Sequence, residues 1–279
     1  MRQEAYFCTV KELDELGKNN IPRQLISHTH LIYSSPATLA FNSPGAEGFG
    51  VKRAGLAVPD SVMLIVSPGC CGRNTSVLSS MRAYQDRFYY LLMDETDIVT
   101  GRHLKKIPKA VAEICEGLKK KPSVVMICIT CVDALLGTDM ERVCHKAEEY
   151  AGVPVRPCYM YALTREGRKP PMVHVRQSVY SLLEPKKKKG NVVNLLGYFS
   201  PLTDDCELYD LLHGAGVKTI HEISRCKDYA QYQTMSEANF NLVLHPEARF
   251  AAEDFHDRLK IPYIELRRLY QIDKIASQC

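Results

Sequence analysis

The chain has 279 residues, of which 46% are hydrophobic and 24% charged, a composition typical of a globular protein with roughly two domains. Its net charge of +4 is too small to indicate nucleic-acid binding. No apolar run reaches the length of about 18 residues that a membrane helix needs, and the first residues contain no long apolar segment, so we expect no membrane or secretory segment and a cytoplasmic protein.

Eleven cysteines are many for a chain of this kind. Their number is odd and their spacings are irregular, which does not fit a full disulfide framework. Metal binding, redox chemistry or simple burial is expected instead. Four of them lie in apolar or helical patterns and are interpreted as small buried hydrophobic side chains: Cys115, Cys128, Cys144 and Cys206.

The first 45 residues show little regular pattern beyond a short helix at 11–16, and residues 45–50 form a glycine-rich loop without phosphate-loop spacing. From residue 61 onward strands and helices alternate, which predicts a mostly parallel sheet covered on both faces. The predicted strands are 61–66, 88–93, 123–130 and 153–158. The predicted helices are 73–82, 103–120, 140–151 and 173–183, with a loop at 94–101.

Four lysines and a glycine at 186–190 interrupt this pattern and are interpreted as a solvated linker. We therefore predict two domains, 1–189 and 190–279. The second has predicted strands at 191–196, 217–220, 240–244 and 261–266, and helices at 204–213 and up to about 259. The predicted fold class is α/β, with two Rossmann-like domains built on mostly parallel sheets.

Cysteines stand at the ends of two predicted strands. Cys70 and Cys71 follow the strand at 61–66, and Cys131 ends the strand at 123–130. Ligands of open α/β sheets bind just beyond the carboxyl ends of the strands. Cysteines delivered there from different strands can face one metal site, although buried cysteines without a ligand remain the alternative.

Several motifs, in order, resemble those of nitrogenase component 1-type oxidoreductases. Residues 68–72, Pro-Gly-Cys-Cys-Gly, resemble the family's Pro-x-Gly-Cys-Gly cluster motif, with Cys71 at the cysteine position and Cys70 where glycine is usual. Residues 95–101 resemble its acidic Glu-x-Asp-Ile-Val-x-Gly loop. Cys131 and the residues that follow resemble its Cys-x5-Gly-Asp-Asp-Ile motif.

The resemblance continues into the second domain, at 194–199 and 241–263, and the chain ends where a third domain would start. The family includes nitrogenase subunits, scaffolds for cofactor assembly and other two-component reductases. In nitrogenase a cysteine near the position of His245 holds the large active-site cluster. Because this chain has histidine there, the resemblance does not imply dinitrogen reduction with that cofactor.

The resemblance implies an iron–sulfur cluster, 4Fe–4S or larger, at a subunit interface. Its ligands would be Cys71 and Cys131, with Cys70 as a competitor or additional ligand. The implied partners are a second component 1-type subunit, in a homo- or heterodimer, and a separate ATP-hydrolysing iron protein. This chain has no Gly-x4-Gly-Lys-Ser/Thr loop, so any ATP requirement would come from that iron protein.

The expected function is that of an electron-transfer or catalytic subunit of an ATP-dependent, two-component reductase. The alternatives are a scaffold for assembly of a complex iron–sulfur cofactor and a non-catalytic partner subunit. His174 and His245 are candidate proton donors. The segment 161–172 is rich in basic residues and proline and suits an anionic substrate, although its residues 165–169 could equally be a solvated loop. The other candidates for substrate contact, inside and beside this segment, are Tyr159, Tyr161, Arg165, Arg168, Lys169 and Arg176.

Overall fold

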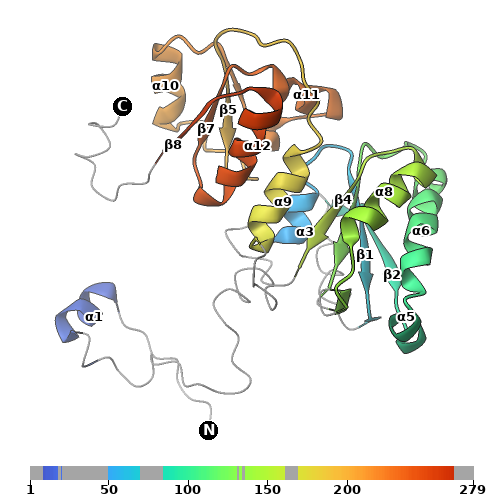
Figure 1. Ribbon diagram of the computed structural model, residues 1–279. Coiled ribbons are helices and arrows are strands. Elements are labelled where there is room, and N and C mark those ends of the chain that lie inside the picture. Colours follow the sequence, from blue (N-terminus) through green and yellow to red (C-terminus); the bar gives the residue numbers. More distant parts are fainter. Residues whose placement is uncertain are drawn as a thin grey trace. The chain divides into compact units, whose positions relative to one another are not determined.

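The computed structural model describes residues 9–17, 20, 50–69, 84–130, 132–133, 136–160 and 169–266. The chain forms two compact units, Met1–Pro36 and Ala37–Cys279. In the first unit lies helix α1 (Val10–Leu16), close to the predicted 11–16 (Figure 1). The Thr9 hydroxyl accepts from the Glu12 backbone N–H (3.2 Å), and Glu12 accepts from the Thr9 N–H (2.7 Å). This reciprocal cap explains where the helix begins.

The second unit contains two four-stranded sheets, and every strand pair in them is parallel. The first sheet has the order β2-β1-β3-β4: β1 (Val62–Ser67), β2 (Phe88–Leu92), β3 (Val125–Ile129) and β4 (Val155–Tyr159). The second has the order β6-β5-β7-β8: β5 (Val192–Leu196), β6 (Thr219–His221), β7 (Phe240–Val243) and β8 (Tyr263–Glu265). The predicted fold class, α/β with mostly parallel Rossmann-like sheets, is confirmed.

Helices cover both faces of the first sheet (Figure 1). Residues of β1 alternate between two apolar clusters, as strand geometry requires. One cluster includes side chains of α3 (Val51–Gly55) and α9 (Pro171–Tyr180). The other includes side chains of α6 (His103–Gly117) and α8 (Met140–Ala151). β1 and β3 are buried along their whole length because both faces are covered, which explains their continuous apolar sequences.

Helix α9 also packs against the second sheet's elements, α12 (Arg249–Leu259) and the 3-10 turn η7 (Pro246–Ala248). One apolar cluster therefore runs from the first sheet to the second. The second sheet's region also contains the described helical elements α10 (Glu207–Gly214), α11 (Tyr229–Gln233), η5 (Ile223–Arg225) and η6 (Thr234–Glu237). The division at residue 189 stays a prediction. Among the described residues, no helix has the length and apolar character to cross a bilayer.

The predicted loop at 94–101 is wrong in its central part, which forms helix α5 (Glu95–Thr100). The Asp94 carboxylate accepts from the Asp97 backbone N–H (2.6 Å), and Asp97 accepts in return from the Asp94 N–H (3.4 Å). Gly101, at φ 64°, ends the helix. A capping box and a left-handed glycine therefore make a helix of a six-residue segment that has no apolar periodicity. The predicted helix at 73–82 lies outside the described residues.

Candidate functional site

The carboxyl edge of the first sheet is where the sequence predicts a metal site. β1 and β3 are neighbours, and Val66 pairs with Ile129, so the two strands end side by side. The described chain extends to Gly69 after β1 and to Thr130 after β3. The predicted ligands follow directly and lie outside the described residues: Cys70, Cys71 and Cys131. Their role stays a prediction, whereas the adjacency of the strand ends that lead to them is observed.

Two buried hydroxyl groups mark these same strand ends. Ser67 is the last residue of β1 and Thr130 follows β3 directly. The two residues are 0% and 2% exposed. Neither hydroxyl oxygen has a hydrogen-bond partner within the part of the chain that the structure describes. Such a group is uncommon in folded proteins, because burying it unpaired costs about 1–3 kcal/mol.

A buried carboxylate, Asp97, lies in the acidic motif and ties α5 to α6. It accepts hydrogen bonds from Lys106 Nζ and Arg102 Nε, both at 2.7 Å. These cations, Lys106 above all, hold the pKa of Asp97 well below its usual value. The side chain of Asp97 is only 1% exposed. The charge of Asp97 is therefore compensated inside the fold, so it serves the structure of this edge and is not presented to solvent.

His103 and Asp133 form a buried side-chain pair at this edge, with 2.9 Å between His103 Nε2 and Asp133 Oδ1. Their side chains are 1% and 0% exposed. His103 Nδ1 lies 3.0 Å from the Asp97 backbone oxygen, and Thr138 Oγ1 donates to Asp133 Oδ1 (3.1 Å). The pair therefore connects the acidic motif to the segment after Cys131. Neither residue is identifiable from the sequence, because a lone histidine and a lone aspartate 30 positions apart carry no spacing signal.

His174, a predicted proton donor, lies on α9 and faces the first sheet. Its ring meets Tyr159 edge-on at 4.4 Å between centroids, and its Nδ1 lies 3.2 Å from Ser178 Oγ. The Ser178 hydroxyl donates its proton to the Pro157 carbonyl (3.0 Å), so Nδ1 of His174 is the donor toward Ser178. Burial, with a smaller effect of Lys169, lowers the pKa of His174 to about 4. The ring is therefore neutral at pH 7 and poorly suited to donate a proton as imidazolium.

His245, the other predicted proton donor, stands at the carboxyl edge of the second sheet, just after β7. Its Nδ1 accepts from the Glu247 backbone N–H (3.3 Å), which leaves the proton of the neutral ring on Nε2. Its ring lies 5.7 Å from that of Tyr198. Gly197, at φ 139°, lets the chain after β5 pass close to His245, since a Cβ on Gly197 would meet His245 Cβ and N at 2.8 Å. His174 therefore lies on helix α9 against the first sheet, whereas His245 lies at the edge of the second sheet.

Arg176 is not available for an anionic substrate in the way the sequence suggested. Its side chain is 2% exposed. It donates to the Gly197 carbonyl oxygen (2.7 and 3.0 Å), to the Met172 carbonyl oxygen (3.0 Å) and to Glu247 Oε2 (2.7 Å). The guanidinium also lies 5.0 Å from the centre of the Phe199 ring. Arg176 is therefore an internal tie between α9 and the edge of the second sheet.

Lys169 donates to Gln177 Oε1 (2.8 Å) and lies over the Phe250 ring at 4.7 Å. Three other predicted contact residues lie outside the described residues: Tyr161, Arg165 and Arg168. The basic segment as a substrate site stays a prediction.

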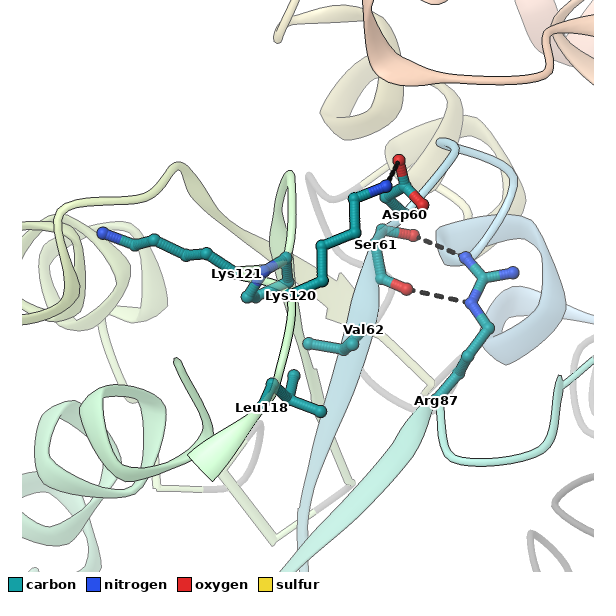
Figure 2. A pocket seen from close by; sticks show the side chains of 8 residues that line it. Asp60, Ser61, Val62, Arg87, Leu118, Lys120 and Lys121 are labelled. Carbon is teal, nitrogen blue, oxygen red and sulfur yellow. Dashed lines mark hydrogen bonds and ion pairs between the residues drawn. The ribbon is translucent and has the colours of Figure 1, made fainter. Parts of the chain in front are cut away.

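A hollow of about 300 Å³ opens at the opposite, amino-terminal edge of the first sheet (Figure 2). Its polar lining is internally satisfied. Arg87 donates to the backbone oxygen and hydroxyl of Ser61 (both 2.9 Å), and Lys120 pairs with Asp60 at 2.8 Å. Ligands of parallel sheets bind at the carboxyl ends, so this hollow is not the predicted site.

The sequence matches the profile of the family described as "Nitrogenase component 1 type Oxidoreductase" over residues 47–277. The chain belongs to this family. The match spans both sheets and all three predicted ligands, Cys70, Cys71 and Cys131. The predicted family resemblance is therefore confirmed.

Curated relatives carry the name "Nitrogenase iron-molybdenum cofactor biosynthesis protein NifE". The protein from Nostoc sp. is 27% identical over 225 residues, which cover 77% of this chain and 46% of the relative. That from Klebsiella pneumoniae is 26% identical over 244 residues, covering 80% and 53%. The chain thus spans about half the length of these relatives. A solved structure described as nitrogenase Cp1 at pH 6.5 has the same fold, with a TM-score of 0.63 at 16% identity over 92% of this chain and 60% of that one.

Membership of the nitrogenase component 1-type family implies that a metal–sulfur cluster is bound. The thiols themselves lie outside the described residues. The edge nevertheless holds two buried O–H groups that lack an acceptor, on Ser67 and Thr130. Cluster sulfurs accept hydrogen bonds, so the residues present fit such a group.

Several other cysteines of this component 1-type chain serve packing. Cys128 and Cys144 are buried, as predicted, and so is Cys158. Burial raises the pKa of Cys128 to about 12 and raises that of Cys158 well above its usual value. Cys115 and Cys206 are half-buried, less than predicted. Burial of Cys128, Cys144 and Cys158 disfavours the thiolate that metal binding requires.

Proposed function

We propose that the chain is an iron–sulfur subunit of a nitrogenase-like, two-component reductase and that Cys71 and Cys131 bind the cluster. One observation carries the proposal. The neighbouring strands β1 and β3 end in register, and within a few residues each leads into a cysteine of a family motif. Strands in a sheet lie about 4.8 Å apart, so two thiols delivered from these ends are within reach of one cluster.

The proposed cluster lies between two chains. A 4Fe–4S cluster takes four cysteine thiolates, and this chain supplies Cys71 and Cys131. A twofold axis brings the same patch of a second subunit opposite the first. The second subunit is either another copy or a different component 1-type chain. Cys70 is the alternative to Cys71, or an additional ligand of a larger cluster.

Electrons would come from a separate ATP-hydrolysing iron protein in the cytoplasm. Any ATP requirement would belong to that protein, because this chain has no Gly-x4-Gly-Lys-Ser/Thr loop for ATP. When bound, the cluster supplies one-electron transfer. The chain's own part is to hold it at the sheet edge and to exclude water from the buried side, where Ser67 and Thr130 lie.

Protons for a reductive reaction would come from His245 Nε2. This atom carries the proton of the neutral ring, because Nδ1 accepts from the Glu247 N–H. His174 is the second candidate, but its lowered pKa keeps it neutral at pH 7, so it would act by hydrogen bonding.

A scaffold for cofactor assembly is the second candidate function. The observation that favours it is the name of the curated relatives, which are cofactor biosynthesis proteins. A non-catalytic partner subunit would bind the cluster at the same edge, but His245 would donate no proton to a substrate. Transfer of bound iron and sulfide to an acceptor apoprotein, without turnover, would support the scaffold. Sustained ATP-dependent oxidation of the iron protein would support the reductase.

The test of cluster binding uses the full chain, reconstituted anaerobically with ferrous iron and sulfide. Cys71→Ala and Cys131→Ala should each lose most of the bound iron and the charge-transfer absorption of the wild type. Cys206→Ala is the matched control, since that half-buried thiol lies in the second sheet's region and should leave the iron content unchanged. Full iron content in both Cys71→Ala and Cys131→Ala would exclude the proposal.

A further inference from the structure

The unpaired hydroxyls of Ser67 and Thr130 lie at adjacent positions of neighbouring strands. Val66 pairs with Ile129, so continuing the register by one residue places Ser67 beside Thr130. Ser67 is held by the sheet, because its carbonyl oxygen accepts from the Met93 N–H (3.0 Å). The Ile129 carbonyl accepts from the Met160 N–H at 3.3 Å, so the ladder continues to the end of β3.

Both hydroxyls also lie on one face of the sheet. Met63 and Ile65 of β1 and Met126 and Cys128 of β3 belong to the apolar cluster shared with α3 and α9. Side chains alternate along a strand, so Ser67, two residues after Ile65, lies on that face. Thr130 follows β3 directly, and the same alternation continued by one residue places it on that face. Two donors that lack an acceptor are thus side by side, on the face and at the edge where the cysteine segments begin.

Apolar side chains at positions 67 and 130 would avoid the cost of burying an unpaired hydroxyl. An alanine or a valine at these positions needs no partner, whereas an unpaired buried hydroxyl is destabilising. A buried group of this kind calls for an explanation outside the protein's own hydrogen bonds, such as a bound ligand or water. The ligand that fits is a hydrogen-bond acceptor at this edge of the sheet, where the proposed cluster would bind.

We infer that Ser67 Oγ and Thr130 Oγ1 donate hydrogen bonds to sulfur atoms of the cluster. They are positioning and tuning residues and not ligands. Hydrogen bonds to cluster sulfurs stabilise the reduced, more negative state and raise the reduction potential. The inference rests on the proposed function, because it requires a cluster at this edge.

The test compares Ser67→Ala and Thr130→Val with the wild type after anaerobic reconstitution. Iron content should be unchanged, because no ligand is removed. The reduction potential from an anaerobic redox titration should become more negative in each variant. The iron–sulfur stretching bands in resonance Raman spectra should lose the small shift that exchange into D2O causes in the wild type. Thr130→Ser, which keeps the hydroxyl, should retain the wild-type potential.

Ser236→Ala provides the matched control. Ser236 is also 0% exposed, but its hydroxyl donates to the Gln233 carbonyl (2.8 Å) in the second sheet's region. This variant should lose stability and keep the potential, whereas the apo forms of Ser67→Ala and Thr130→Val should be as stable as the wild type or more so. Unchanged potentials and Raman bands in both variants would overturn the inference while leaving the cluster in place. A wild type that binds no iron, whether alone or mixed with a second component 1-type chain, would overturn the proposed function as well.

Discussion

At the scale of single residues, burial decides which titratable groups can serve chemistry. Asp97 is buried and His174 is half-buried, yet their pKa values are lowered for opposite reasons. Burial of His174 penalises its charged form, whereas Lys106 and Arg102 favour the charged form of Asp97. The two groups therefore affect stability in different pH ranges.

His174 should make the fold sensitive to mild acid. Between its unfolded pKa near 6.5 and its folded pKa of about 4, only the unfolded chain takes up the proton. Stability should therefore fall as the pH falls through this window, by about 3 kcal/mol at about 1.4 kcal/mol per pKa unit. In His174→Phe, the free energy of unfolding, measured by urea titration from pH 7 to 4, should fall by correspondingly less. His256→Gln, at an exposed histidine, should follow the wild type; equal slopes in the wild type and His174→Phe would contradict this.

Asp97 should also lose its stabilising effect as the pH falls, but in a lower pH range than His174. Its folded pKa is depressed by Lys106 and Arg102, so its contribution is present above the unfolded pKa near 3.8 and is lost as the pH falls toward the folded value. Asp97→Asn should unfold at a lower temperature than the wild type at pH 7. The difference should shrink as the pH falls below about 4, as calorimetry would show. A difference independent of pH would mean that only the capping geometry matters.

At the scale of elements, apolar patterns predicted most of the sheets because both faces of β1 and β3 are covered. Helix α8 was predicted at its observed bounds, since Asp139 caps it and Gly152 ends it in the left-handed conformation. Short elements were missed where local hydrogen bonds outweigh periodicity, as in α5. The same local signal, Asp94 three residues before Asp97, was present in the sequence and could have identified the helix.

The candidate site was only partly predictable for a related reason. Motif order identified the strands that carry Cys71 and Cys131, and the structure places the ends of those strands together. Pairings between distant segments have no local signature. The sequence therefore gave no indication that His103 meets Asp133, or that Arg176 is buried against Gly197 and Glu247.

Gly197 should be the residue on which the edge of the second sheet most depends. Its φ of 139° is disfavoured for other residues, and an added Cβ would meet His245 backbone and side-chain atoms at 2.8 Å. Gly197→Ala should destabilise the fold by roughly 2–3 kcal/mol, measured by chemical denaturation. Gly214→Ala, at the end of α10 with open space around it, should be neutral or slightly stabilising. Equal effects of the two substitutions would contradict the close approach.

At the scale of the whole molecule, the number of cluster thiolates that one chain supplies determines whether chains must associate. The second unit has extensive buried cores of its own, so the fold does not need a metal to form. The proposed cluster needs more thiolates than Cys71 and Cys131 of one chain. Metal should therefore govern association between chains more than folding of each chain.

Removal of iron should accordingly separate subunits without unfolding them. If two identical chains share one 4Fe–4S cluster, the reconstituted protein should contain about two iron atoms per chain. Analytical ultracentrifugation under anaerobic conditions should then show the mass of a dimer. Chelation, or the Cys131→Ala substitution, should shift the mass toward that of one chain while far-ultraviolet circular dichroism stays unchanged. A single chain that keeps about four iron atoms would place the cluster within one subunit, and the shared site would be excluded because no second chain would be needed to complete its ligands.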